Sequence, residues 1–142
     1  MIIAIASDHA GYELKEIIKD YFDMNNIVYK DFGTNSAESV DYPIYAKKVC
    51  ASIQTGENDF GVLVCGTGIG MCIAANKHKN IRAACCHETF SAKMARLHND
   101  ANVLTIGSRA IGPGLALEIV KKFLSADFEG GRHSGRLSMI DD

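Results

Sequence analysis

The chain has 142 residues, of which 47% are hydrophobic and 23% charged, and its formal net charge is −2. This length fits one domain with one core, and the composition excludes a disordered chain. The small negative charge excludes the broad basic surface typical of nucleic-acid or membrane binding. An anionic ligand would have to be held by a few placed cations.

Short apolar runs alternate with longer amphipathic ones from the start of the chain. Residues 2–6 are all apolar and predict a strand covered on both faces. No basic segment precedes them, so they do not resemble a signal peptide. Apolar residues at helical spacing between 14 and 22 predict a helix, and residues 27–32 predict the second strand. The next helix is expected to be capped by Ser39 or Asp41.

The second half of the chain continues this alternation. Because strands separated by helices imply right-handed crossovers, the sequence predicts one α/β domain with a parallel sheet of about five strands. No apolar run approaches the roughly 18 residues that a membrane helix needs. The remaining strands are predicted at 60–64, 81–86 and 103–106, and the remaining helices at 71–79, 88–98 and 113–124.

Polar clusters follow three of the predicted strands. They are Ser7-Asp8-His9, the loop from Cys65 to Gly70, and Gly107-Ser108-Arg109, while His98-Asn99-Asp100 closes the helix that feeds the last strand. In an open parallel sheet, ligands bind beyond the carboxyl ends of the strands. We therefore expect a site where these clusters converge.

The loop after the third strand has glycines at 66, 68 and 70, followed by a predicted helix. Such a loop turns backbone N–H groups toward one point, which suits a phosphate or an oxyanion formed during a reaction. It is not a Walker loop, since no Lys-Ser or Lys-Thr follows Gly70, and Met71 occupies the third glycine of a dinucleotide fingerprint. Glu88 lies where a ribose-binding acid could fall, so a dinucleotide site stays an alternative.

Cys65 is expected at the mouth of this loop, where a helix N-terminus would favour its thiolate. The alternative is a small buried hydrophobic side chain, which is how we interpret Cys50, Cys85 and Cys86, and Cys72 is expected to pack inside the following helix. Five cysteines, two of them adjacent, indicate reduced thiols in a cytoplasmic protein.

The arginines and histidines in the C-terminal half of the sequence could bind a ligand or could simply be solvated surface residues. Arg132 and Arg136 are four residues apart, so on a helix they share a face that suits a phosphate dianion or is simply a solvated basic end. His98 alone would be a surface helix residue. The spacing of the cysteines and histidines matches no CxxC or HxxxH pattern, so no metal site is predicted.

Several motifs together resemble ribose-5-phosphate isomerase type B, in the same order and spacing from Met1 to the C-terminal tail. The wider family also contains allose-6-phosphate isomerases and galactose-6-phosphate isomerase subunits. Some members replace the cysteine by a glutamate just after the glycine loop, where this chain has Met71, so it resembles the cysteine type. The motifs are Ser7-Asp8-His9-Ala10-Gly11, Asp31-Phe32-Gly33-Thr34, Cys65-Gly66-Thr67-Gly68-Ile69-Gly70, Ala74-Ala75-Asn76-Lys77, His98-Asn99-Asp100-Ala101-Asn102 and Gly131-Arg132-His133.

The resemblance implies a Rossmann-like three-layer αβα domain over residues 1–142, with a tail of about 126–142 that contributes phosphate-binding arginines. It implies a cytoplasmic homodimer, in some members a tetramer, with each active site shared between two subunits. The implied reaction interconverts D-ribose 5-phosphate and D-ribulose 5-phosphate in the pentose phosphate pathway, without metal or organic cofactor. A six-carbon sugar phosphate, or a non-catalytic nucleotide- or phosphosugar-binding role, stays an alternative.

The resemblance also implies roles for individual residues. Cys65 is the general base, assisted by Thr67, and His98 is the acid that opens the sugar ring, with Asp8 helping. The implied binding residues are His9, Arg132 and Arg136 on the phosphate, Arg109 across the subunit boundary, Gly66, Thr67, Gly68, Ile69 and Gly70 as an anion hole, and Asn99 and Tyr42 on sugar hydroxyls.

Overall fold

The computed structural model describes residues 1–141, in which five strands form one sheet with the order β2-β1-β3-β5-β4. All four neighbouring pairs are parallel, which confirms the predicted parallel sheet. β5 lies between β3 and β4, so the last strand along the chain is central. The strands are β1 (Ile2–Ser7), β2 (Val28–Asp31), β3 (Phe60–Cys65), β4 (Ala83–Cys85) and β5 (Val103–Gly107).

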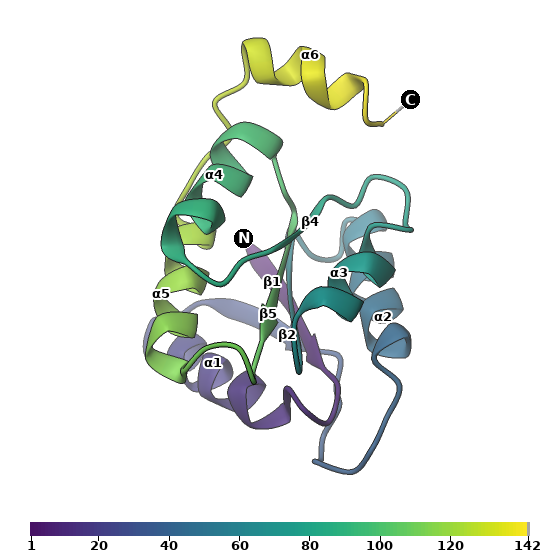
Figure 1. The fold of residues 1–142 in the computed structure, drawn as a ribbon, viewed down its shortest axis with the longest axis vertical. Helices are drawn as coiled ribbons and strands as arrows, with labels where there is room; N and C mark the ends of the chain where they lie inside the picture. The colour runs from purple at the N-terminus through teal and green to yellow at the C-terminus, as the bar shows by residue number, and fades with distance from the viewer. Residues whose placement is uncertain (142) are drawn as a thin grey trace.

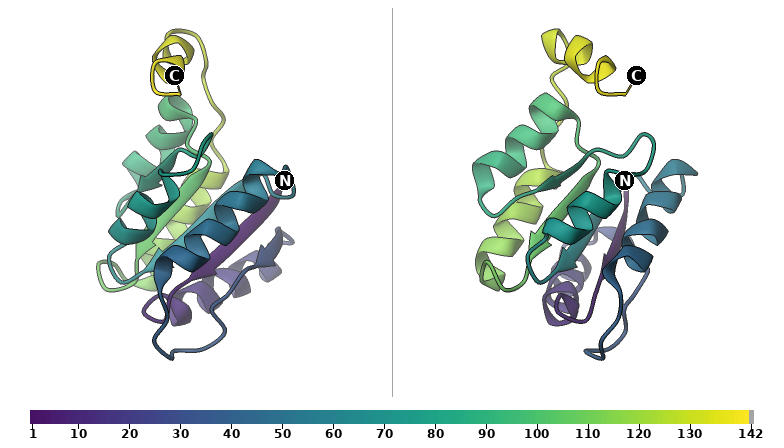
Figure 2. Two further views of the ribbon diagram at one scale, coloured as in Figure 1. Left: turned by 90° about the vertical axis from the view of Figure 1, so that its right-hand side faces the viewer. Right: turned by 45° about the vertical axis from the view of Figure 1, so that its right-hand side comes forward.

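Helices cover both faces of the sheet and complete the predicted three-layer αβα architecture (Figures 1 and 2). One hydrophobic cluster joins α1, α4 and α5 to one face, and a second joins α2 and α3 to the other. The helices are α1 (Tyr12–Met24), α2 (Tyr42–Gln54), α3 (Ile69–Ala75), α4 (Thr89–Asn99), α5 (Pro113–Leu124) and α6 (Arg132–Ser138). No helix among residues 1–141 has the length and hydrophobicity to cross a membrane.

Alternation along the strands explains the two cores. Successive strand residues point to opposite faces, so Ile3 and Ile5 pack with α1, α4 and α5, whereas Ala4 and Ala6 pack with α2 and α3. Gly61 of β3 has the Val49 side chain so close that an added Cβ would lie 2.7 Å from it. Small residues on the second face therefore let α2 approach the sheet closely.

Some predicted boundaries are wrong, and local hydrogen bonds explain why. The strand predicted at 81–86 is confined to Ala83–Cys85, and Asn76 binds the N–H and C=O of Ala83 at 2.8 and 2.9 Å. α3 begins at Ile69 and ends at Ala75, earlier than the predicted 71–79. α4 begins at Thr89 because Glu88 is its N-cap.

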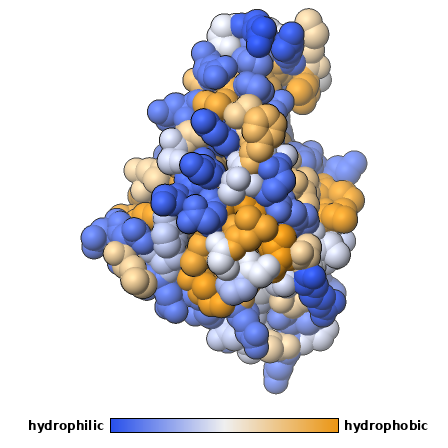
Figure 3. Space-filling view, turned by 60° about the vertical axis from the view of Figure 1, so that its left-hand side comes forward, coloured by the Kyte–Doolittle hydropathy of each residue, from blue (hydrophilic) through white to orange (hydrophobic). Residues whose placement is uncertain are grey.

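α6 lies beyond the end of α4, on the side of the molecule where the strands begin, and it projects from the top of the molecule (Figures 1 and 3). The chain reaches it through Gly130 and Gly131, both with positive φ (67° and 57°), a conformation that favours glycine. This turn directs the buried side chains of α6, His133 and Leu137, back toward the body. α6 contacts the end of α4.

Candidate active site

The carboxyl ends of β1, β3 and β5 lie side by side, as the polar clusters predicted. The N–H of Asp8 donates to the carbonyl of Val64 at 3.2 Å, and the N–H of Ser108 donates to the carbonyl of Cys65 at 2.8 Å. These backbone bonds continue the pairing of the three strands past their ends. The loops that follow the strands are thereby held together as one surface.

Cys65 is the last residue of β3, and its side chain points into the glycine loop. The Gly68 N–H donates to its sulfur with an N–S distance of 3.2 Å. The residue is only 4% exposed, so its sulfur is buried against this loop. A backbone donor directed at sulfur stabilises a thiolate, because the anion is the stronger acceptor.

Two glycines let this loop close against β5. Gly68 has φ 76°, and a Cβ there would lie 2.9 Å from the carbonyl carbon of Ile106. The φ of Gly107 is not in the left-handed region, but a Cβ on this residue would lie 2.6 Å from the backbone of Thr67. The loop and the end of β5 are therefore in backbone contact, which leaves no room for side chains at either position.

Asp8 and His9 follow β1 on the same edge. Asp8 is buried, and its Oδ1 accepts a hydrogen bond from the Gly11 N–H at 3.0 Å, at the start of α1. The Nδ1 of His9 lies 3.2 Å from the backbone N of Val40, a group that can only donate. The same Nδ1 lies 3.3 Å from the carbonyl oxygen of Val40, so both backbone groups of Val40 hold the imidazole ring in place.

Tyr42 and Arg109 flank the loop on two sides. A Cβ on Gly70 would lie 2.7 Å from Cζ of Tyr42, so the tyrosine ring lies directly against the loop. The Arg109 side chain passes 3.5 Å from where a Cβ of Gly66 would be, and its backbone N–H donates to the Gly66 carbonyl at 3.0 Å.

The hydroxyl of Thr67 also belongs to this loop. Its Oγ1 accepts a hydrogen bond from the Ile69 N–H at 3.3 Å, which leaves the hydroxyl proton free to donate. Thr67 is exposed at the rim of the loop.

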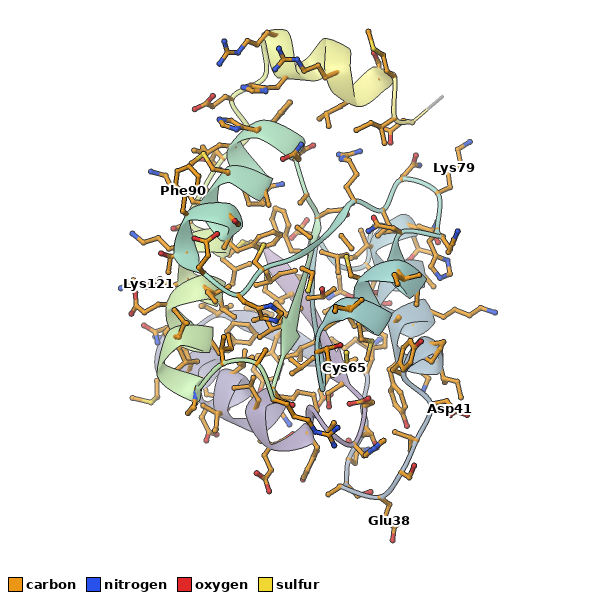
Figure 4. The ribbon with its side chains drawn as sticks, viewed as in Figure 1. Glu38, Asp41, Cys65, Lys79, Phe90 and Lys121 are labelled. Atoms are coloured by element: carbon orange, nitrogen blue, oxygen red, sulfur yellow. The ribbon has the colours of Figure 1, made fainter. Side chains whose placement is uncertain are left out.

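Four of the predicted site residues lie elsewhere in the chain. His98 and Asn99 end α4, and Arg132 and Arg136 lie on α6, all at the edge where strands begin. The five residues of β5, at about 3.3 Å each, put about 15 Å of sheet between that edge and Cys65. Figure 4 shows Cys65 at the end of the sheet remote from α6. One chain does not bring the two groups together.

His98 stacks on His133, with ring centroids 4.4 Å apart and planes 12° apart. Oε2 of Glu129 lies 3.9 Å from Nε2 of His98 and 3.7 Å from Nε2 of His133. We call these three residues the Glu129 cluster. Burial lowers the pKa of His133, and the neighbouring His98, Arg132 and Arg136 lower it further, whereas Glu129 raises it.

Neither Glu129 nor His133 was predicted to belong to the site. His133 appeared in the sequence only as part of the motif Gly131-Arg132-His133. The spacing of four residues between Glu129 and His133 was a usable signal, but the stacking depends on the turn at Gly130 and Gly131. That turn was not apparent from the sequence.

The Glu129 cluster is also the one group of metal-ligating side chains that we find among residues 1–141, with ligand atoms within 4.8 Å of one another. Imidazole binds a metal through a lone pair in the ring plane. Because the two rings are almost parallel, their lone pairs do not converge on one ion. A shared metal would require one ring to turn.

The other cysteines have structural surroundings. Cys50 and Cys86 are buried, as predicted, and burial raises the pKa of their thiols to about 11 and about 12. The predicted burial of Cys85 is wrong, because it is partly exposed beside the loop and its thiol donates to the carbonyl of Thr67 at 3.8 Å. Cys72 is also only partly buried. All five are free thiols.

Glu88 has a structural role at the start of α4. Its carboxylate accepts hydrogen bonds from the N–H groups of Phe90 and Ser91, both at 2.6 Å. The hydrogen bonds from Ser91 are the main cause that lowers the pKa of Glu88. The carboxylate caps α4, so the geometry removes the support for a dinucleotide site.

A hollow of about 670 Å3 opens at the α6 edge, away from Cys65. It lies between α6 and the segment that precedes β4. Its lining includes Lys77, Lys79, Asn99, Leu137 and Ile140. Asn99 is the only predicted site residue in this lining.

The fold and this loop together define an α/β protein with a buried thiol facing a glycine-rich loop at the carboxyl ends of a parallel sheet. Residues 3–140 match the family described as Ribose/Galactose Isomerase. The chain therefore belongs to the Ribose/Galactose Isomerase family.

Individual relatives agree with this assignment over nearly their whole length. A putative sugar phosphate isomerase of Bacillus subtilis is 52% identical, with 100% of this chain and 96% of the relative covered. The structure of Clostridium thermocellum ribose-5-phosphate isomerase B superposes with a TM-score of 0.98 at 49% identity, covering 99% and 95% of the two chains. Ribose-5-phosphate isomerase B from Mycoplasma genitalium, solved with bound ribulose-5-phosphate, gives 0.93 at 41% identity, covering 99% and 93%.

Proposed function

We propose that this chain is an aldose–ketose isomerase that interconverts D-ribose 5-phosphate and D-ribulose 5-phosphate. The observation that carries the proposal is the sulfur of Cys65 held against the Gly68 N–H in an anion-binding loop. Support for the substrate comes from the Mycoplasma genitalium relative, whose structure holds ribulose-5-phosphate. No cofactor or metal ion takes part in the proposed reaction.

The reaction has three steps. The furanose opens when the bond between C1 and the ring oxygen breaks, the ring oxygen gains a proton and the anomeric hydroxyl loses one. The Cys65 thiolate then removes the proton from C2, and the electron pair forms the C1–C2 double bond of an enediolate while charge moves to O1. Finally the thiol returns the proton to C1 while the proton of O2 passes to O1, which gives the ketose with its C2 carbonyl and C1 hydroxyl. One base suffices because C1 and C2 are adjacent.

The loop stabilises the charge that develops on oxygen. Backbone N–H groups of Gly66, Thr67, Gly68, Ile69 and Gly70 are the proposed donors, and each such donor contributes roughly 3 kcal/mol to stabilising a transition state. The Thr67 hydroxyl assists proton movement at O1 and O2. Tyr42, which lies against Gly70, and Asn99 are proposed to bind sugar hydroxyls.

Phosphate binding and ring opening require a second copy of the chain. His9 and Arg109 lie on the same edge as Cys65, whereas His98, Asn99, Arg132 and Arg136 lie at the other edge. We propose a homodimer in which the α6 edge of one copy meets the glycine loop of its partner, so that the tail from about residue 126 completes the partner's site. A tetramer would be a pair of such dimers.

Exposed apolar side chains around the loop support this assembly. Ile44, Ile69 and Ile73 are between 53% and 59% exposed, and all three belong to α2 or α3 next to the loop. Neither Arg132 nor Arg136 forms an ion pair with another residue of the described chain, so both cations are available for a phosphate dianion.

The free thiols fit a reducing compartment. We propose that the protein acts in the cytoplasm, in the pentose phosphate pathway, as one sugar-phosphate isomerase domain over residues 1–142.

A six-carbon sugar phosphate is the second candidate substrate, because the family description includes galactose. The test is the comparison of kcat/KM for ribose 5-phosphate, allose 6-phosphate and galactose 6-phosphate on the purified protein. The proposal requires the pentose phosphate to be preferred by at least tenfold. Binding of a sugar phosphate without incorporation of solvent deuterium at carbon would instead support a non-catalytic binding module.

A further inference from the structure

Glu129 is fixed beside the end of α4 by its backbone. Its N–H donates to the carbonyl of Leu97 at 3.0 Å. The side chain is about half exposed, yet its Oε2 lies within 4 Å of Nε2 of both His98 and His133. Glu129 thus bridges the linker before α6 to the two stacked rings.

His133 has an unpaired polar atom that points into this cluster. The residue is 7% exposed, and its Nε2 is buried without a hydrogen-bond partner in the described part of the chain. A buried unpaired nitrogen costs roughly 1–3 kcal/mol. Oε2 of Glu129 lies 3.7 Å from this nitrogen, and a proton on Nε2 turns the unpaired atom into a donor toward that carboxylate.

The surroundings are otherwise cationic. His98 on α4 and Arg132, His133 and Arg136 on α6 all carry or can carry positive charge. Glu129 is the one acidic group within ion-pair distance of either ring among residues 1–141. Without it, two imidazoles and two guanidinium groups would favour loss of the imidazole proton.

We infer that Glu129 is a positioning residue that keeps a proton on the stacked His98–His133 pair, so that His98 can donate it during ring opening. The inference rests on the proposed function and deepens it. In the step concerned, the C1–ring oxygen bond breaks and its electron pair stays on the ring oxygen. That oxygen takes the proton from Nε2 of His98, while the anomeric hydroxyl passes its proton to the carboxylate of Asp8 in the facing copy.

The test separates ring opening from proton transfer at carbon. Ribose 5-phosphate enters as a furanose, whereas ribulose 5-phosphate stays open, because the hydroxyl that would close a five-membered ring carries the phosphate. Turnover of ribose 5-phosphate reports both steps, and deuterium exchange at C1 of ribulose 5-phosphate in D2O reports only the carbon step. Both are measured for the wild type, Glu129→Gln, Glu129→Asp and the control Glu118→Gln, whose side chain is exposed on α5 without an ion pair in the described chain.

We expect Glu129→Gln to lower ribose 5-phosphate turnover roughly tenfold and deuterium exchange less than twofold. The basic limb of its kcat/KM profile moves to lower pH, because loss of the carboxylate weakens the hold on the proton. Glu129→Asp keeps the negative charge, so the basic limb of its kcat/KM profile should return most of the way to the pH of the wild type. Glu118→Gln behaves like the wild type.

Two results would overturn the inference while leaving the proposed function intact. One is a Glu129→Gln protein indistinguishable from the wild type in turnover and pH profile. The other is a Glu129→Gln protein that loses ribose 5-phosphate turnover and deuterium exchange to the same extent. A purely structural role produces that equal loss, together with a lower thermal unfolding temperature. A wild type that neither turns over ribose 5-phosphate nor exchanges deuterium would overturn the proposed function, and this inference with it.

Discussion

Cys65 and His98 lie at opposite edges of one sheet, although the proposed reaction needs both at the same sugar. A single chain cannot meet that need, because β5 and its neighbours separate the two side chains. The proposed site is therefore assembled from two copies, and this proposal can be tested with pairs of inactive variants.

Co-expression of Cys65→Ala with His98→Asn is expected to restore activity that neither variant has alone. In a mixed dimer, one of the two sites receives the intact cysteine of one copy and the intact histidine of the other. The mixed dimer, isolated by two different tags, should therefore have about half the turnover of the wild type, since one site in two is complete. If both residues acted within one chain, every site would keep one lesion and the mixture would stay inactive.

Cys65→Ala is expected to remove proton transfer and leave binding. Loss of a general base lowers turnover by roughly 100- to 10,000-fold, and deuterium exchange at C1 of ribulose 5-phosphate should fall with it. Binding of the sugar phosphate, measured by calorimetry, should change by less than about threefold, because the phosphate is held by other residues.

Cys72→Ser is the matched control for this experiment. Cys72 is a partly buried thiol of α3 that contacts the carbonyl of Ala83 and not the loop. It should keep nearly full turnover. Substantial isomerase activity in Cys65→Ala would remove the cysteine from the role of base.

A buried ion pair under β2 makes the fold sensitive to acid. Lys15 is fully buried, and its Nζ lies 2.6 Å from Oδ2 of Asp31. Burial opposes ionisation of Asp31, but hydrogen bonds from Lys15, Lys19 and the Gly33 N–H outweigh it and hold the pKa of Asp31 below its usual value. A depressed carboxyl pKa stabilises the folded state above the unfolded pKa of about 4, and this stability is lost as the pH falls through the folded value.

Asp31→Asn is therefore expected to lower the free energy of unfolding at pH 7 by roughly 2 kcal/mol, because the buried Lys15 ammonium group loses one of its two carboxylate partners and keeps only Glu16. The difference from the wild type should shrink as the pH is lowered below 4. Glu57→Gln, which breaks the exposed pair with Lys30, should cost less than about 1 kcal/mol. Urea unfolding at pH 7 and pH 3 measures both, and a pH-independent difference for Asp31→Asn would contradict the linkage.

The layers of the fold could be predicted from the sequence, because buried strands and amphipathic helices leave strong periodic patterns. Their boundaries were less predictable. The length of β4 depends on Asn76, whose side-chain amide forms hydrogen bonds with both the N–H and the C=O of Ala83. A side chain that replaces a neighbouring strand as hydrogen-bond partner leaves no periodic pattern of apolar residues in the sequence. The start of α4 was missed by one residue because Glu88 is its N-cap.

The same contrast holds for the site. Cys65 and the glycine loop are contiguous, so their association was apparent in the sequence. Glu129 and His133 join His98 only because two successive glycines turn the chain back onto α4. No local pattern around His98 indicated that contact.

Gly107 tests whether the backbone contact between β5 and the loop matters for catalysis. In Gly107→Ala the new Cβ would lie 2.6 Å from the backbone of Thr67. Because backbone atoms cannot rotate away as a flexible side chain can, the loop must shift, at a cost of roughly 1–3 kcal/mol in the free energy of unfolding. Gly114→Ala on α5 is the matched control, since nothing lies within 4 Å of its Cβ position, and alanine there should stabilise the helix by up to about 1 kcal/mol.

The displaced loop should lower turnover in Gly107→Ala by at least tenfold at temperatures where the protein is fully folded, since the donors of the anion hole move with Thr67. Normal turnover in a folded Gly107→Ala protein would mean that the loop can be displaced without harm, and the backbone N–H groups would then lose their assigned part in stabilising the enediolate.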